Sequence, residues 1–437
     1  MSKKSDCEDL KNVMNSGKGN ISSLTLSLAS LSEFHSIYII FLGIIESHYI
    51  EGGQKMQKYF RIVLTMLLVL GNIGVAKVQP VLGVEIQTDA TSAILMDAAS
   101  GEIYFEKESH KELPPASVTK IMTLLVAAEA IATEKVKLTD KVTASENASK
   151  LGGSQIYLEP GEIFTLEQML IAIAVGSAND GCVAVAEHIT GTHEAFVEEM
   201  NRKAQELGLK NTHFANAYGL PAEGHYTSAY DLAVISKEAL NYPLIRKLTS
   251  IKEYDLRDGK FKLWNTNKLL WWYPGADGFK TGWTNEAKYC LASTVERNGL
   301  RLICVVMGVP QVRGHFAESM KIYNYGFAKY EFKQFAPANA KQGVVKVLKG
   351  VEDQVIVNTE KPLGATVEKG KDKNLWVETK LNPEVSAPIQ KGQTLGQVHL
   401  YRNDQLKASV NLIADHAVAK AGLVQQVERT LKGVFGY

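Results

Sequence analysis

The segment Pro114-Pro-Ala-Ser-Val-Thr-Lys-Ile-Met-Thr-Leu-Leu-Val-Ala-Ala128 begins with two prolines and continues as a nearly unbroken apolar run. Prolines interrupt the preceding chain, so the pattern predicts a helix over 117–131 that begins at Ser117. Lys120 follows three residues later and therefore lies on the same helical face as Ser117. The apolar neighbours indicate burial, which favours the neutral form of a lysine. A neutral Lys120 is suited to act as the base that activates the Ser117 hydroxyl.

Two further short motifs follow in order along the chain. Ser117-Val-Thr-Lys120 matches S-x-x-K, Ser177-Ala-Asn179 matches S-x-N, and Lys280-Thr-Gly282 matches K-T-G. S-x-N alone carries little information, because Ser145-Glu-Asn147 also fits it. The ordered triple is specific, and it is the motif set of the serine acyl transferases found among penicillin-binding proteins and class A β-lactamases.

The S-x-N motif falls where a helical pattern over 165–191 is interrupted, at about 176–181. A break of this kind lets the Ser177 hydroxyl and the Asn179 amide point into a cleft. We expect Ser177 to relay a proton to a leaving amine and Asn179 to hold the substrate peptide. The alternative is ordinary turn chemistry, which both residue types favour.

The K-T-G motif lies on a predicted strand over 279–283. Gly282 allows a substrate to lie along the backbone as an added strand. Lys280 and Thr281 are candidates for binding a carboxylate. A second cation at Lys280 also lowers the pKa of Lys120 through charge repulsion.

The patterns around these motifs predict an α+β domain over about 86–331. A hairpin is predicted at 92–96 and 102–105, and strands at 279–283, 289–295 and 300–309. Further helices are predicted at 194–207, 230–239 and 318–330. The nearly all-apolar run around Val305 is typical of a central strand.

A second domain is predicted after a linker over 333–341. Short alternating runs dominate from there to 415, at 344–348, 355–357, 375–378, 396–400 and 408–412. Gly, Pro and Asn separate these runs, which indicates a small all-β domain over 341–415. No catalytic constellation is evident in it, so a spacer or docking module is the preferred interpretation.

The region 56–76 has the pattern of a secretory signal peptide. Lys58 and Arg61 precede an apolar stretch over 62–76, with small residues at Gly74 and Ala76. Residues 1–55 are polar and Ser-rich, and do not belong to such a signal. We expect that translation begins at Met56 and that 1–55 is an untranslated upstream extension; the alternative is an uncleaved cytoplasmic extension.

The last residues, over 416–437, are predicted to form a basic amphipathic helix. Its apolar residues fall within one arc at helical spacing, and its charge is net positive. Such a segment is suited to lying on a membrane surface with anionic lipids. The alternative is a helix packed against the β domain.

The composition excludes other classes of function. The 437 residues carry a net charge of +1, so no global field favours nucleic acid. The four cysteines form no CxxC pair and no histidine cluster has metal-ligand spacing, so neither a metal nor a cofactor is predicted. Cys290 and Cys304 are expected to be small buried hydrophobes.

Three stretches resemble the low-molecular-mass penicillin-binding D-alanyl-D-alanine carboxypeptidases. They are Pro115-Ala-Ser-Val-Thr-Lys-Ile-Met-Thr123, Val175-Gly-Ser-Ala-Asn-Asp-Gly-Cys182 and Asp277-Gly-Phe-Lys-Thr-Gly-Trp-Thr284. Shorter stretches share the resemblance: Phe196-Val-Glu-Glu-Met-Asn201, Gly219-Leu220 and Gly224-His225. The resemblance covers about 86–430, and implies a serine β-lactamase/penicillin-binding-protein-like α+β catalytic domain followed by a small all-β domain. Lys288 departs from the family, since glycine is common there, which leaves the local strand geometry open.

The resemblance also implies an activity. Ser117 would be acylated by a peptidoglycan stem peptide, with Lys120 as base, Ser177 as proton shuttle and Asn179 as substrate ligand. The backbone N–H groups of Ser117 and Trp283 would form the oxyanion hole. β-Lactams would be covalent inhibitors, and the enzyme would work on the outer face of the cytoplasmic membrane. Arg313 is a weaker candidate for the terminal carboxylate, and an exposed arginine is its alternative.

Three competing functions fit less well. A class A β-lactamase needs a deacylating glutamate in E-x-x-L-N, and Glu198-Glu-Met-Asn201 lacks that spacing. A high-mass transpeptidase needs a large module before the nucleophile, and too few residues separate Met56 from Ser117. An inactive cell-wall binding protein would not need intact Ser117 and Lys120.

Overall fold

The computed structural model describes residues 86–371, 373–425 and 427, which belong to one unit that begins at Glu85. The predicted extension 1–55, the predicted signal 56–76 and most of the predicted C-terminal helix lie outside the described residues. Within the described ranges, no helix is both long enough and apolar enough to cross a membrane.

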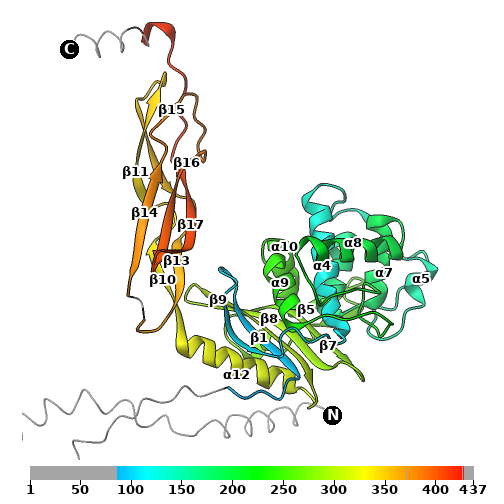
Figure 1. Cartoon of the computed structure of the whole chain (residues 1–437). Helices are drawn as coiled ribbons and strands as arrows, with labels where there is room; N and C mark the ends of the chain where they lie inside the picture. The colour runs from blue at the N-terminus through cyan, green and yellow to red at the C-terminus, as the bar shows by residue number, and fades with distance from the viewer. Residues whose placement is uncertain (1–85, 372, 426, 428–437) are drawn as a thin grey trace, which may run out of the picture. The chain divides into compact units, whose positions relative to one another are not determined.

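The catalytic domain is built on a five-stranded antiparallel sheet with the order β2-β1-β9-β8-β7 (Figure 1). Its strands are β1 Ser92–Asp97, β2 Ile103–Lys107, β7 Ala276–Thr284, β8 Lys288–Arg297 and β9 Leu300–Val309. The predicted hairpin and the three predicted later strands are confirmed. β9 is the middle strand, as its apolar sequence indicated, and β7, which carries K-T-G, is an edge strand.

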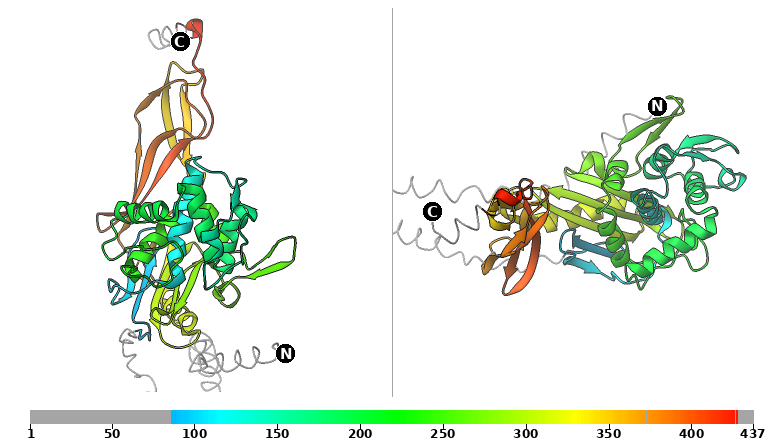
Figure 2. Two further views of the ribbon diagram at one scale, coloured as in Figure 1. Left: turned by 90° about the vertical axis from the view of Figure 1, so that its right-hand side faces the viewer. Right: turned by 90° about the horizontal axis from the view of Figure 1, so that it is seen from above.

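Both faces of this sheet are buried, which explains the uninterrupted apolar sequence of β9. Ile303, Val305 and Met307 pack in the core shared with the helical layer. Leu302, Cys304 and Val306 alternate with them and pack in a second core that includes α12 Gly314–Lys329. Figure 2 shows the sheet between these two layers. A strand buried on both faces carries apolar residues at every position rather than at alternate ones.

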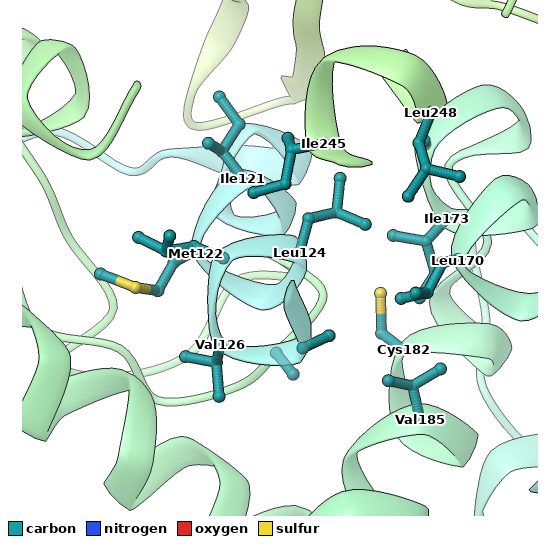
Figure 3. Packing of buried hydrophobic residues seen from close by; sticks show 14 of the residues in the cluster. Ile121, Met122, Leu124, Val126, Leu170, Ile173, Cys182, Val185, Ile245 and Leu248 are labelled. Carbon is teal, nitrogen blue, oxygen red and sulfur yellow. The ribbon is translucent and has the colours of Figure 1, made fainter. Parts of the chain in front are cut away.

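The helical layer holds most of the catalytic motifs. It contains η1 Ala116–Thr119, α4 Lys120–Ala132, α6 Leu166–Ile171, the π-helical η2 Ala172–Gly176, α7 Asn179–Thr190, α8 His193–Glu206, α9 Ala229–Ala239 and α10 Pro243–Thr249. Helix α4 is central: Leu124 lies close to Ile173 and Ile245 in the packed core (Figure 3). Each such side chain contributes about 2 kcal/mol by leaving water. This packing fixes the helix on which Lys120 stands.

The short elements were not predicted. They are β3 Lys141–Thr143, α5 Glu146–Ser149, β4 Ile163–Thr165, β5 Glu253–Leu256, β6 Phe261–Trp264 and α11 Leu269–Trp272. Elements of three or four residues are too short to show a periodicity of their own. Their partners specify them, as in the pairing of Val142 with Phe164.

The C-terminal domain is all-β, as predicted. Its strands are β10 Tyr330–Ala336, β11 Lys341–Leu348, β12 Gln354–Thr359, β13 Leu363–Glu368, β14 Leu375–Leu381, β15 Glu384–Ser386, β16 Thr394–Arg402 and β17 Gln405–Ala414. Six form a sheet with the order β14-β16-β17-β12-β11-β15, and β10 pairs with β13.

The predicted linker over 333–341 is wrong in its first part. Lys333 and Gln334 belong to β10 and pair with Ala365 and Gly364 of β13. The strand carries polar residues on an incompletely buried surface, so its sequence resembles a connector. Its backbone partner lies about thirty residues further along the chain, where no local pattern reveals it.

The predicted C-terminal helix over 416–437 is wrong in its first part. Val418 pairs with Ile389 and Lys420 with Gly350 as isolated β-bridges, and Val418 is fully buried in the β-domain core. This extended segment therefore belongs to the β domain. Beyond it, Leu423 and Val424 start a helical turn and are strongly exposed, with 82% and 73% of their surfaces accessible.

Candidate active site

Ser117 and Lys120 are in direct contact. Ala116–Thr119 forms a single 3-10 turn, and Lys120 begins α4 immediately after it. The Lys120 Nζ lies 2.9 Å from the Ser117 Oγ. Lys120 is fully buried. The predicted helix therefore begins with a tighter turn than expected, but the three-residue spacing still brings the candidate base and the candidate nucleophile into contact.

Two further oxygen atoms surround the Lys120 amine. Nζ donates to Asn179 Oδ1 at 2.7 Å and to the Tyr218 carbonyl at 2.5 Å. A neutral amine has two N–H bonds and one lone pair. When both N–H bonds are directed at these acceptors, the lone pair is left for the Ser117 hydroxyl, which then becomes the donor. The geometry suits Lys120 as a base.

The environment also favours the neutral amine. Burial lowers the pKa of Lys120 to about 8. Burial and the charge of Lys120 together lower the pKa of Lys280 to about 7. Two ammonium groups that repel each other titrate as a pair, so the pair readily gives up a proton near neutral pH.

Asn179 has a role that its sequence motif did not suggest. Besides accepting from Lys120, its Nδ2 donates to the Gly152 carbonyl at 2.7 Å. The two ends of the amide are thus both occupied by protein groups, and only one orientation of the amide fits these partners. Asn179 therefore orients the lysine in the free enzyme.

Ser177 lies at the junction of η2 and α7, within the predicted helix break. Its backbone is left-handed, with φ 63°, and the residue is almost entirely buried. A non-glycine residue in this conformation costs about 1–3 kcal/mol, and such residues cluster at functional sites. Ser177 therefore lies two residues before Asn179, whose side-chain amide accepts from Lys120.

The K-T-G strand lies directly against the Ser117 turn. A Cβ built on Gly282 would lie 3.0 Å from the Ser117 nitrogen and 2.9 Å from the Pro115 carbonyl oxygen. Any side chain there would push the strand away from the nucleophile. On the same strand, Lys280 Nζ donates to the Thr281 carbonyl at 3.0 Å, and the Thr281 hydroxyl donates to Thr266 Oγ1 at 2.7 Å.

The structure does not bring all the candidates together. The predicted role of Trp283 belongs to its backbone N–H, directly after Gly282, while the residue itself is 54% exposed and its ring lies beside Tyr289. Arg313 is exposed in the left-handed conformation at the start of α12, with φ 60°. Within the described ranges, no hydrogen bond or ion pair joins Arg313 to another candidate residue.

Sequence reasoning missed three of the groups that hold the site. They are the Thr266 hydroxyl and the carbonyl groups of Tyr218 and Gly152. A backbone carbonyl has no sequence signature, because every residue carries one. Thr266 lies outside the motifs and is matched to Thr281 only by the fold.

The backbone conformation of Lys288 accounts for the frequency of glycine at this position in the family. It is the first residue of β8, and its backbone is left-handed, with φ 55°. Glycine adopts this conformation without steric cost, which accounts for its frequency there. Lysine at this position costs roughly 1–2 kcal/mol of strain but leaves the pairing with Thr284 intact.

The site combines three features: a serine contacts a buried lysine, the asparagine of S-x-N accepts a hydrogen bond from that lysine, and the K-T-G edge strand lies against the serine. Together these features define a penicillin-binding serine acyl transferase. The family model described as D-alanyl-D-alanine carboxypeptidase matches residues 76–311, and the model of the penicillin-binding protein 5 C-terminal domain matches residues 330–420. The chain belongs to this family of serine-type D-alanyl-D-alanine carboxypeptidases, which act on peptidoglycan.

Relatives support this assignment over most of the chain. The D-alanyl-D-alanine carboxypeptidase DacF of Bacillus subtilis is 44% identical over 351 residues, 79% of this chain and 90% of the relative. Penicillin-binding protein 5 from Haemophilus influenzae has a similar structure, with a TM-score of 0.60 and 34% identity, covering 77% of this chain and 99% of that one. Penicillin-binding protein D2 from Listeria monocytogenes, in its ampicillin-bound form, matches with a TM-score of 0.51 and 29% identity, covering 56% of this chain and 99% of that one.

Proposed function

We propose that Ser117 is the nucleophile of this carboxypeptidase and Lys120 its base. The observation that carries the proposal is the set of contacts around the Lys120 Nζ, which lies 2.9 Å from Ser117 Oγ and has protein acceptors for its other two directions. A base must lie within hydrogen-bond reach of the proton that it removes. Lys120 meets this condition before substrate binds.

In acylation, neutral Lys120 takes the hydroxyl proton as Ser117 Oγ attacks the carbonyl carbon of the penultimate D-Ala. Negative charge develops on the carbonyl oxygen, where the Ser117 and Trp283 N–H groups stabilise it. The C–N bond then breaks, and the departing amine of the terminal D-Ala receives the proton through the Ser177 hydroxyl. The products are free D-Ala and an ester on Ser117.

In deacylation, a water molecule attacks the same ester carbonyl. Lys120 takes a proton from this water and returns one to the Ser117 oxygen as the ester bond breaks. The shortened stem peptide leaves with a new carboxyl group. No residue beyond those used in acylation is needed.

Substrate binding is assigned from the position of the polar groups. Lys280 and Thr281 lie on the strand that contacts the Ser117 turn, so they bind the carboxylate of the terminal D-Ala. Arg313 is the second candidate, and within the described part of the chain no hydrogen bond or ion pair joins it to Lys280 or Thr281. Asn179 binds the substrate only if its Nδ2 exchanges the Gly152 carbonyl for a peptide carbonyl.

β-Lactams acylate the same serine in this scheme. Opening of the lactam ring also leaves an ester on Ser117, but the ring nitrogen becomes an amine that stays attached to the acyl group and keeps water from the ester. The ampicillin-bound relative from Listeria monocytogenes supports this assignment.

The test compares two serines in S-x-x-K and S-x-N contexts. Ser117→Ala is expected to abolish labelling by a fluorescent penicillin and the release of D-Ala from a small peptide. Ser145→Ala is the matched control, because Ser145 lies in the second S-x-N pattern and only caps the short helix α5. Labelling that persists in Ser117→Ala would refute the nucleophile.

We also propose that the enzyme is held at the outer face of the cytoplasmic membrane by its C-terminal segment. Peptidoglycan lies outside that membrane, and the predicted signal over 56–76 provides a route there. The exposed Leu423, Val424 and Val427 begin the predicted amphipathic helix. Apolar residues of such a helix enter the lipid interface, and basic residues bind anionic headgroups.

The anchor is tested by stopping the chain after Gly422. This position is preferable to a stop after Asp415, because Val418 and Ala421 are buried against the β domain. The shortened protein is expected to leave the washed membrane fraction and to release D-Ala at the full rate. A shortened protein that stayed in the membrane fraction would contradict the anchor, and one that unfolded earlier would favour a packed helix.

A further inference from the structure

His225 lies outside the three motifs, in the connection between α8 and α9, yet it contacts the turn that carries Ser117. Its ring is buried, and the residue is only 6% exposed. Nε2 lies 2.9 Å from the Thr119 hydroxyl, and Nδ1 lies 2.9 Å from the backbone nitrogen of Ala215. Both ring nitrogens are therefore used.

The two contacts specify the same tautomer. The Ala215 nitrogen donates, so Nδ1 accepts and carries no proton. The Thr119 hydroxyl has one proton, which it donates to the Ala116 carbonyl at 2.8 Å, so His225 Nε2 donates to the hydroxyl. Burial foremost, followed by the charges of His213 and Lys120, lowers the pKa of His225 to about 4 and keeps the ring neutral.

The first branch of this network ends one residue before the nucleophile. Ala116 has a left-handed backbone, with φ 50°, which is unfavourable for a residue with a Cβ. Its carbonyl is held by Thr119, and Thr119 by His225. The Ser117 N–H belongs to the same planar peptide unit as the Ala116 carbonyl, so the direction of this proposed oxyanion donor depends on how that carbonyl is held.

The second branch ends on the base. Ala215 begins the segment 215–220, whose Tyr218 carbonyl accepts from Lys120. Asn216 Oδ1 accepts from the Tyr218 and Gly219 nitrogens and shapes this segment. A Cβ built on Gly219 would lie 1.9 Å from the Ala116 oxygen, so the segment and the Ser117 turn are in close contact.

We propose that His225 is a positioning residue for acylation, because it joins the peptide before Ser117 to the segment that binds Lys120. It touches neither the nucleophile nor the base and acts through Thr119 and Ala215. The inference rests on the proposed roles of Ser117 and Lys120. It goes beyond them because a neutral imidazole outside the motifs, through the hydrogen bond that it donates, holds the oxyanion hole and the base in position.

A histidine that only filled the core would behave differently. Its replacement would lower stability, but the fraction of protein that remained folded would be acylated at the normal rate. A positioning residue changes the rate of the chemical step in the folded enzyme. The measurement must therefore separate the acylation rate constant from penicillin binding and from the folded fraction.

The experiment measures the acylation rate constant and the dissociation constant of a fluorescent penicillin from the concentration dependence of labelling. In His225→Leu the rate constant is expected to fall about 10- to 100-fold, as for small displacements of reacting groups, with binding changed by less than about threefold. His225→Gln is expected to restore the rate to within about threefold, because an amide also offers one acceptor and one donor.

Thr119→Val is the second variant, since it removes the hydroxyl with little change of shape. It should lower the same rate constant, and the double variant with His225→Leu should be no slower than the slower single variant, because one chain of hydrogen bonds is cut. His110→Leu is the matched control: His110 is exposed, its ring lies 4.5 Å from the Tyr230 ring, and it takes no part in this chain of hydrogen bonds.

The outcomes are distinguishable. The positioning role would be overturned if folded His225→Leu and Thr119→Val were acylated at the normal rate. It would also be overturned if His225→Leu lost acylation and His225→Gln did not restore it. In both cases Ser117 would remain the nucleophile. Labelling that persists in Ser117→Ala would instead overturn the proposed function itself. Thermal unfolding of each variant gives the folded fraction used in the comparison.

Discussion

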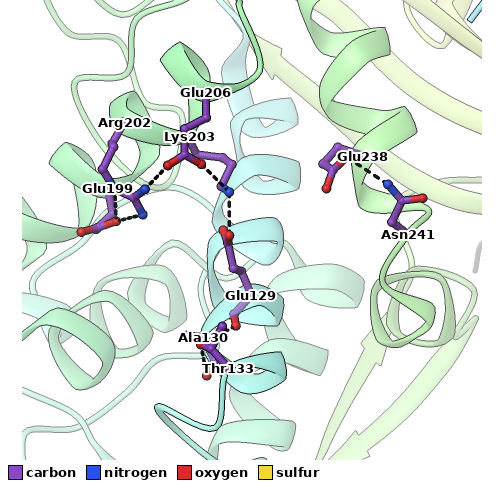
Figure 4. A network of polar contacts seen from close by, with 9 residues as sticks. All are labelled: Glu129, Ala130, Thr133, Glu199, Arg202, Lys203, Glu206, Glu238 and Asn241. Carbon is purple, nitrogen blue, oxygen red and sulfur yellow. Dashed lines mark hydrogen bonds and ion pairs between the residues drawn. The ribbon is translucent and has the colours of Figure 1, made fainter.

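A buried lysine lies at each end of α4, and the pKa values of the two lysines are shifted in opposite directions. At the start of the helix, Lys120 contacts a hydroxyl, an amide oxygen and a backbone carbonyl, and burial lowers its pKa to about 8. Near the end, Glu129 accepts from Lys203 of α8 at 2.6 Å, and Glu206 lies 2.7 Å from the same amine (Figure 4). Burial opposes the charge of Lys203, but the two carboxylates raise its pKa.

The difference shows that the oxygen partners, and not burial alone, decide the charge of a lysine. A carboxylate lies near Lys120 as well, on Asp180, and its charge raises the pKa of the amine in part. Its oxygens, however, accept from the backbone nitrogens of Ile156, Leu158 and Gly181. Asp180 is thereby kept from pairing with Lys120, which favours the neutral amine that the proposed mechanism needs.

The largest expected effect is the loss of the base. Lys120→Met should lower the acylation rate by about 10²–10⁴-fold, the range typical of general-base catalysis, while the protein remains folded. Lys203→Met is the matched control at the other end of α4, where acylation should stay normal. The check is penicillin labelling with thermal unfolding. Equal losses of acylation in the two variants would contradict the comparison.

The second prediction concerns pH. In the proposed mechanism Lys120 acts as a neutral base, so lowering the pH through its pKa of about 8 protonates it and stops acylation. Below pH 7, kcat/KM should fall by about tenfold per pH unit or more, and above pH 8 it should level off. A profile that rose toward acidic pH would exclude the neutral lysine.

The third prediction addresses the ion pair. Glu129→Gln removes one carboxylate from Lys203 but leaves Glu206 in place, so the free energy of unfolding should fall by about 1–2 kcal/mol. Acylation should not change, since Glu129 lies about two and a half turns from the start of the helix beside Ser117. Denaturant unfolding measures the first quantity and labelling the second. A slower acylation would mean that the two ends of α4 are coupled.

The smallest effect is expected at the rim of the same cluster. Arg202 of α8 pairs with Glu199 and Glu206, but its side chain is half-exposed. Arg202→Gln should therefore change the free energy of unfolding by less than about 1 kcal/mol, as is usual for solvated ion pairs. A loss as large as that of Glu129→Gln would show that the surface pairs hold Glu206 in position for Lys203.

Much of the fold was predictable wherever the signal is local. The helix α8 was predicted within one residue, because its apolar spacing is regular and Gly208 follows it with φ 69°. The buried character of Cys290 and Cys304 was also confirmed. Strand β10 was not predicted, because its pairing with β13 is specified by residues far along the chain.

The sequence by itself determined the contact on which the proposed chemistry rests: a spacing of three residues places Lys120 beside Ser117 in any fold that forms the helical turn. It also determined the class of protein, since the S-x-N and K-T-G motifs follow in a specific order. Only the tertiary structure decided how the site is held, through Asn179 on Lys120, Thr266 on Thr281 and His225 on Thr119. Hydrogen bonds between distant segments depend on distances of a few tenths of an ångström, and these arise only when the packed core brings the segments together.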